Sequence, residues 1–158
     1  MSIVDYSDVE LLRNELVVLK HVNFSLEAGE FVYLIGKVGS GKSTLLKSMY
    51  AEIPVQGGSA RVLDFDLNAI RRADIPMLRR QIGIVFQDFQ LLTDRNVYQN
   101  LRFVLEATGW RNADEKEERI DTVLKRVGMA NKSYKMPHEL SGGEQQRIVI
   151  ARALLNNH

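Results

Sequence analysis

The sequence predicts an α/β fold organised around a phosphate-binding loop, and three neighbouring segments support this prediction. Residues 36–44 read GKVGSGKST, which matches the pattern G-x-x-x-x-G-K-[ST]. The five residues before the loop, 31–35, form the apolar run FVYLI and predict a buried strand, and residues 45–50 have helical spacing. Because such a loop lies between a strand and a helix, this context favours a phosphate site over a chance glycine-rich turn.

The residue types of the loop explain the chemistry that is expected of it. Glycines let the backbone N–H groups curve around an anion, where a Cβ would obstruct the turn. The helix that follows adds the positive end of its dipole. Lys42 can reach the β- and γ-phosphates of a nucleotide, and Ser43 can offer its hydroxyl to Mg²⁺.

Length and composition narrow the function classes. The chain has 158 residues, enough for one domain with its own core, and a net charge of +1 that favours neither a nucleic acid nor an acidic partner. It has no cysteine, which excludes disulfides, cysteine zinc sites and a thiol nucleophile and fits the cytoplasm. We find no signal peptide and no apolar run long enough to cross a membrane, so a membrane role is expected to act through a partner.

The rest of the chain alternates between strand and helix patterns. Asn112, with Glu115 three residues later, resembles a capping box that opens a helix ending at Gly128, and the charged residues 114–119 are expected to form its solvated face. The other expected elements are short strands at 16–19 and 22–26 joined by a tight turn at Lys20 and His21, a turn at 28–30, a strand at 60–65, a short basic helix at 77–80, a buried strand at 82–86 and a helix at 96–105.

A second glycine-rich segment, residues 140–147 with the sequence LSGGEQQR, precedes an apolar helical pattern. Ser141 and the free N–H groups of a first helical turn could bind an anion. The simpler interpretation is an ordinary helix with Ser141 as its N-cap, but this leaves the two consecutive glycines unexplained, since each weakens a helix start. Two phosphate-directed sites in one chain suggest a head-to-tail dimer, in which the loop of one subunit and Ser141 of the other enclose the same triphosphate.

Taken in order, residues 36–44, the FQD sequence at 86–88 and residues 140–147 resemble the nucleotide-binding domain of ABC transporters. The resemblance covers the whole chain and implies a P-loop NTPase: a RecA-like core with an N-terminal antiparallel β-subdomain and an inserted α-helical subdomain, incomplete at the C-terminus. It divides the chain into a β-subdomain and phosphate-loop core at 1–87, a helical subdomain at 88–137 and the signature motif with its helix at 138–158.

The resemblance also implies roles for individual residues. ATP and Mg²⁺ would be the ligands of a homodimer that closes on two nucleotides. Lys42 and Gln87 would be catalytic, with Gln87 placing the attacking water and responding to a membrane partner, and Ser43 and Gln87 would ligate Mg²⁺. The nucleotide-binding residues would be Gly36, Lys37, Val38, Gly39, Ser40, Gly41, Lys42, Ser43 and Thr44, with Ser141, Gly142, Gly143 and Gln145 contributed in trans.

Within the family, residues 86–100 resemble the FtsE group of cell-division ATPases, mainly through Asp94-Arg95 and the pattern Val97-Tyr98-x-Asn100. This implies an ATPase that drives an FtsX-like integral membrane subunit in cell division, at the cytoplasmic face of the cell membrane, without binding nucleic acid. The alternative is the ATPase subunit of a lipoprotein-release or macrolide-export transporter, because those groups share much of this segment.

The chain departs from the family pattern in two places. The family stacks adenine on an aromatic residue, but Leu12 occupies that position here, and Tyr6 lies several residues too early unless it folds in. The family also continues with a strand that ends in Asp-Glu and with a later His, none of which follows the signature helix before His158. We therefore expect an open sheet edge beside the phosphate-loop strand, and no ATP turnover by this chain alone.

Overall fold

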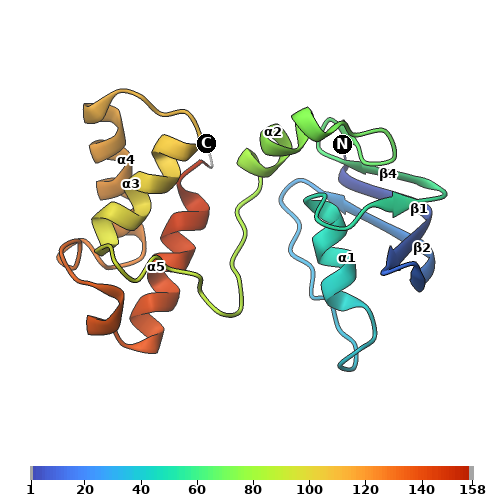
Figure 1. Ribbon diagram of the computed structural model, residues 1–158, viewed down its shortest axis with the longest axis horizontal. Helices are drawn as coiled ribbons and strands as arrows, with labels where there is room; N and C mark the ends of the chain where they lie inside the picture. The colour runs from blue at the N-terminus through green and yellow to red at the C-terminus, as the bar shows by residue number, and fades with distance from the viewer. Residues whose placement is uncertain (1, 157–158) are drawn as a thin grey trace. The chain divides into compact units, whose positions relative to one another are not determined.

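The computed structural model describes residues 2–156, which form two compact units, Met1–Arg79 and Arg80–His158 (Figure 1). The first unit carries an antiparallel sheet, one eight-residue helix and two short helices near its end, and the second unit carries helices. This division falls between the phosphate loop and Gln87. The predicted three-part division at 87/88 and 137/138 follows sequence motifs instead of compact units, and it stays a prediction. The last two residues of its third part, Asn157 and His158, lie outside the described residues.

The sheet of the first unit is built on a long hairpin. Strands β1 (Ser2–Arg13) and β2 (Leu16–Glu27) are joined at Asn14 and Glu15, whose φ angles of 52° and 64° are those of the turn that matches the twist of a hairpin. Strand β4 (Ser59–Val62) pairs with the other edge of β1, β5 (Phe65–Asp66) follows β4, and β3 (Val55–Gln56) pairs with the end of β1. Figure 1 shows helix α1 (Lys42–Met49) beside this sheet. The side chains buried in this unit include Val4, Tyr6, Val9, Leu11, Leu45, Ala60 and Val62.

Two predicted details of this sheet are wrong. The tight turn expected at Lys20 and His21 is part of the continuous strand β2, because one extra residue there is absorbed as a bulge opposite β1, with φ 51° at His21. The single strand expected at 60–65 is instead the β4–β5 hairpin, which reverses through Leu63, at φ 53°, and Asp64.

The strand expected directly before the phosphate loop and the strand expected directly before Gln87 are not formed. Residues 31–35 and 82–86 have no regular structure, and the aromatic side chains Phe31 and Tyr33 are 81% and 78% exposed. The physical reason is pairing: a strand of a parallel sheet is held by backbone hydrogen bonds to a neighbouring strand, and among the described residues neither run has such a neighbour. The apolar composition of both runs is that of buried strands. Neither run has the neighbouring strand that would bury it among the described residues.

The second unit is a helical cluster, preceded by the short helices η1 (Arg72–Asp74) and α2 (Ile75–Arg80). Its helices are α3 (Val97–Ala107), α4 (Ala113–Arg126), the short η2 (Pro137–Glu139) and α5 (Gly142–Leu154). The caps follow the sequence prediction: Asn112 accepts a hydrogen bond from the Glu115 N–H at 3.1 Å, and Gly128, at φ 72°, follows the end of α4. The core of this unit consists of Val97, Leu101, Leu105, Ile120, Val123, Leu124, Met129, Leu140, Ile148, Ala151 and Leu155.

The sequence predicts that the charged residues 114–119 form a solvated face, but the structure confirms this only in part. Lys116 is buried with 6% exposure, and its ammonium donates to Glu106 at 3.2 Å. Arg119 donates to the carbonyls of Leu154 and Leu155 at 2.6 and 2.8 Å, at the end of α5. Both residues therefore tie α4 to its neighbours. Across the described part of the chain, every helix is too short or too polar to cross a membrane.

Candidate nucleotide-binding site

The phosphate loop of the first unit is an exposed turn that leads into α1. Residues 31–40 are all exposed, and the Ser40 N–H donates to the Lys37 carbonyl at 3.0 Å, which closes the turn. The loop needs glycine where it enters the helix, because Gly41 has φ 98° and a Cβ there would lie 2.9 Å from the Leu19 side chain. The Lys42 ammonium folds back over the loop and donates to the Gly36 carbonyl.

The start of α1 differs from the starts of the other long helices. Its N-cap is Gly41, which offers no side-chain acceptor, so no side chain caps the N–H groups of its first turn. The N-caps Asn96, Asn112 and Ser141 each accept a backbone N–H at the starts of α3, α4 and α5. The first turn of α1 thus offers its N–H donors and positive dipole end to an external anion. Its hydroxyls divide between two environments: Ser43 is exposed, as a metal ligand needs to be, whereas Thr44 is buried with 4% exposure.

Tyr6 does not replace the missing adenine-stacking aromatic residue. Its ring is only 2% exposed, and its hydroxyl hydrogen-bonds with Ser48 Oγ at 2.8 Å. Burial raises the pKa of this hydroxyl to about 12, in spite of the bond to Ser48. The possibility that Tyr6 folds in to contact the base is therefore wrong: it is a core residue. Leu12 is half-buried on β1, opposite Val17, and has no aromatic face to offer.

Gln87 lies in the second unit, exposed, in a tight turn that sequence reasoning did not foresee. In the turn at residues 86–90, which we call the Gln87 segment, the Gln90 N–H donates to the Asp88 carbonyl at 2.7 Å. Phe89 and Gln90 have φ angles of 63° and 53°, a region that side chains other than glycine seldom adopt. The carbonyls of Phe89 and Gln90 accept hydrogen bonds from Arg152 of α5 at 2.7 and 2.8 Å.

A buried amide fixes the chain just after this segment. Asn100 is 3% exposed and makes four hydrogen bonds: its oxygen accepts the Leu92 N–H at 2.8 Å, and its nitrogen donates to the carbonyls of Leu92, Arg95 and Asn96 at 3.1, 3.0 and 3.0 Å. In the sequence, Asn100 pointed only to a family resemblance and not to this network. Its position between Val97 and Leu101 on the apolar face of α3 was the available signal, since a polar residue on a buried face needs partners.

Ser141 is the N-cap of α5 and forms a capping box with Glu144. Its hydroxyl accepts the Glu144 N–H at 3.1 Å, and its own N–H donates to Glu144 Oε1 at 3.0 Å. The backbone hydrogen bond from Ser141 and the nearby Lys132, at 3.2 Å, lower the pKa of Glu144. Ser141 is therefore an N-cap, as the simpler interpretation of the sequence predicts. Accepting a bond leaves the hydroxyl proton available for donation, so capping and anion binding are compatible.

The glycines after Ser141 are not required by the chain itself. A Cβ on Gly142 or Gly143 would meet no atom within 4 Å, and neither residue has a positive φ. Glycine costs helix stability, so the contacts within this chain do not explain its presence at both positions. Gln145 has a role that sequence reasoning missed: its amide nitrogen donates to the carbonyls of Pro137 and Leu140 at 3.1 and 3.3 Å, which fixes the turn before Ser141.

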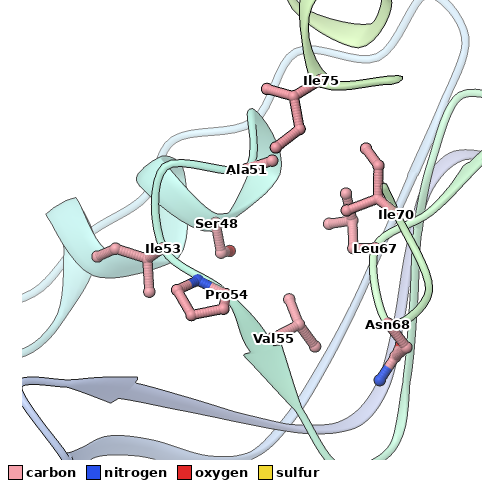
Figure 2. A pocket seen from close by; sticks show the side chains of 9 residues that line it. All are labelled: Ser48, Ala51, Ile53, Pro54, Val55, Leu67, Asn68, Ile70 and Ile75. Atoms are coloured by element: carbon pink, nitrogen blue, oxygen red, sulfur yellow. The ribbon is translucent and has the colours of Figure 1, made fainter. Parts of the chain in front are cut away.

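The first unit also has a hollow of about 260 Å³ at the other end of α1, away from the phosphate loop. Figure 2 shows its mostly apolar lining from the end of α1, the chain that leads into β3, and residues after β5: Ser48, Ala51, Ile53, Pro54, Val55, Leu67, Asn68, Ile70 and Ile75. It has no charged side chain that could bind a phosphate group. Among the described residues, no group of three or more acidic or histidine side chains could hold a metal ion.

Comparison with known proteins identifies the family of this chain. The sequence pattern of the family described as ABC transporter matches residues 19–158. The Cell division ATP-binding protein FtsE of Streptococcus pneumoniae is 44% identical over 158 residues, 99% of this chain and 68% of that protein. The protein of the same name from Escherichia coli is 41% identical over 138 residues, 87% of this chain and 62% of that protein.

Solved structures of ATP-binding cassettes also match this chain. The structure of cbiO1 from Clostridium perfringens, described as part of the ABC transporter complex cbiONQ, matches with a TM-score of 0.87 at 31% identity, over 98% of this chain and 62% of that one. A dimeric post-hydrolysis state of the ATP-binding cassette MJ0796, bound to ADP and Pi, matches with a TM-score of 0.83 at 32% identity, over 97% of this chain and 69% of that one. The chain thus spans about two thirds of the length of these relatives.

Proposed function

The chain belongs to the ABC transporter family, as an FtsE-like ATPase domain, and from this premise we propose that it binds Mg-ATP and that the full-length protein hydrolyses it as a homodimer to drive a membrane subunit in cell division. The observation that carries the ATP proposal is the uncapped first turn of α1 directly after a glycine-lined loop. An ATP triphosphate would supply the missing cap to these N–H groups.

The residues present fit the nucleotide and its metal. Lys42 already lies over the loop and would exchange its bond to the Gly36 carbonyl for the β- and γ-phosphates. The exposed hydroxyl of Ser43 and the amide of Gln87 would hold Mg²⁺, which when bound neutralises charge on the phosphates. Gln87 would also orient the attacking water, since its side chain is exposed and a structured turn directly follows it.

The dimer proposal is supported by the two glycines of α5. Their open side fits the approach of a γ-phosphate bound to the loop of a second subunit, which Ser141 would contact through its hydroxyl proton. Among the relatives, MJ0796 is described as dimeric in a post-hydrolysis state. The FtsE relatives carry the name Cell division ATP-binding protein, which supports the cell-division setting. The proposal adds a peripheral position on the cytoplasmic face of the cell membrane and an FtsX-like integral membrane partner.

The ATP proposal is tested by nucleotide titration in the presence of Mg²⁺. Lys42→Ala is expected to weaken ATP binding by at least about tenfold, because it removes a charge-assisted contact to phosphate. The matched control is Lys47→Ala, which removes the same side chain from the last turn of the same helix. Equal affinity in the two variants would contradict the proposal. Co-purification of a transport permease instead of an FtsX-like subunit would leave ATP binding intact but reject the cell-division setting.

A further inference from the structure

Arg152 joins the strained turn after Gln87 to the helix that starts at Ser141. Arg152 lies near the C-terminal end of α5 and donates from both terminal nitrogens of its guanidinium, Nη1 to the Gln90 carbonyl at 2.8 Å and Nη2 to the Phe89 carbonyl at 2.7 Å. Bonds of this length from an ionised fork are charge-assisted and fix the orientation of both acceptors. Two carbonyls that point at one guanidinium require the backbone between them to keep its present turn.

That turn is unfavourable on its own. A bond from the Gln90 N–H to the Asp88 carbonyl closes it over three residues, with Phe89 at φ 63° in the middle, and three-residue turns of this hand are rare and strained. Gln90 is also in the left-handed region. Such a conformation persists only where the surroundings enforce it. Burial lowers the pKa of the Arg152 guanidinium, because the charged group is partly removed from water where it donates to these carbonyls.

We propose that Arg152 is a positioning residue for Gln87, which links the orientation of α5 to the Gln87 segment of the same chain. Ser141 and Arg152 are separated along α5 by about 16 Å of helix, a rigid connection at the rise of an α-helix. With the proposed function as its basis, this link means that the γ-phosphate contacted in trans at one end of α5 sets the backbone two residues beyond Gln87 at the other end. Each subunit would then sense its partner's nucleotide and adjust its own Mg²⁺ and water ligand.

The test uses the full-length protein and three variants. Arg152→Ala removes the link, Arg152→Lys keeps the charge but not the two-pronged geometry, and Arg126→Ala removes an exposed arginine from α4 of the same unit. Hydrogen exchange followed by mass spectrometry should show amides 88–91 exchanging about tenfold faster in Arg152→Ala than in Arg126→Ala, with Arg152→Lys intermediate. The maximal rate of ATP hydrolysis should fall about tenfold in Arg152→Ala, while ATP affinity stays within about threefold.

Two further comparisons separate positioning from stability and from the proposed function. Leu155→Ala removes a fully buried side chain of the second unit and should lower the melting temperature without faster exchange confined to amides 88–91. In a Gln87→Ala background, Arg152→Ala should cost no further activity, because it acts through Gln87. The role of Arg152 would be overturned by an additional loss of activity in the Gln87→Ala background, or by unchanged exchange at amides 88–91, even if Lys42→Ala abolishes turnover. Full turnover by Lys42→Ala would instead overturn the proposed function. The hydrogen-exchange result does not depend on that outcome.

Discussion

Replacing Gly142 with aspartate should have opposite effects on the isolated chain and on its proposed dimer. Within the chain, a Cβ at Gly142 meets no atom within 4 Å, so aspartate fits without displacing anything. Gly142 is the first residue of α5, where a carboxylate gains roughly 0.3–1 kcal/mol from the helix dipole and glycine is the poorer helix former. Folding stability should therefore be unchanged or rise by up to about 1 kcal/mol.

The same carboxylate would face a triphosphate if the glycines of α5 approach the γ-phosphate of a partner. Two like charges about 4 Å apart, at the effective dielectric constant of a protein surface, repel by about 4 kcal/mol. This corresponds to roughly a thousandfold weaker ATP-dependent dimer. ATP binding by the monomer should change little, because the phosphate loop belongs to the other unit of the chain.

The assay is ATP-dependent dimerisation of the full-length protein by sedimentation, next to thermal unfolding of the same samples. Gly142→Asn is the matched control, because it has the size of aspartate without the charge. We expect Gly142→Asp to melt at or above the temperature of Gly142→Asn and to dimerise at least about a hundredfold more weakly. If both variants dimerise equally well with ATP, no phosphate approaches this helix start, and the reasoning from the two glycines is refuted.

Three buried polar groups give further predictions, each measured by denaturant unfolding. The folded-state pKa of Tyr6, about 12 against an ordinary 10.0, predicts stability that is complete below pH 10 and lost by roughly 3 kcal/mol as pH rises to 12, a loss that Tyr6→Phe should lack. Asn100→Ala should cost about 2–4 kcal/mol, because the Leu92 N–H and the Arg95 carbonyl lose the amide, whereas the carbonyls of Leu92 and Asn96 keep backbone N–H donors; a cost below about 0.5 kcal/mol would mean that water replaces the amide. Lys116→Met should change stability by less than about 1.5 kcal/mol, since it keeps the buried volume and gives up only an ion pair with the half-exposed Glu106; a loss above about 3 kcal/mol would show that the pair is essential.

Local signals in the sequence predicted local structure well. The starts of the helices that begin after Asn96, Asn112 and Ser141 follow from side chains that accept backbone N–H groups, and Gly128 ends α4 in a left-handed conformation. Interactions of this kind form between neighbours in the chain, so the sequence contains both partners. The glycine pattern of the phosphate loop is predictable for the same reason.

Properties that depend on distant partners were not predictable. Residues 31–35 and 82–86 have the composition of buried strands, but a strand also needs a ladder partner, which composition does not report. The left-handed turn at Phe89 and Gln90 depends on Arg152, sixty-three and sixty-two residues away. A weak signal existed for such partners, since Arg152, like Asn100 and Lys116, is a polar residue at apolar-stripe spacing and must find a partner where it is buried.

The central claim, that each nucleotide site combines the loop of one subunit with the Ser141 end of the other, is tested most directly by mixing two defective variants. Lys42→Ala alone and Gly142→Asp alone should each fail to dimerise with ATP, because every site in either dimer contains one damaged half. A mixed dimer has one site with both defects and one fully intact site, so an equal mixture should form dimers on addition of ATP. A mixture that remains monomeric, while the unaltered protein dimerises under the same conditions, would contradict the claim.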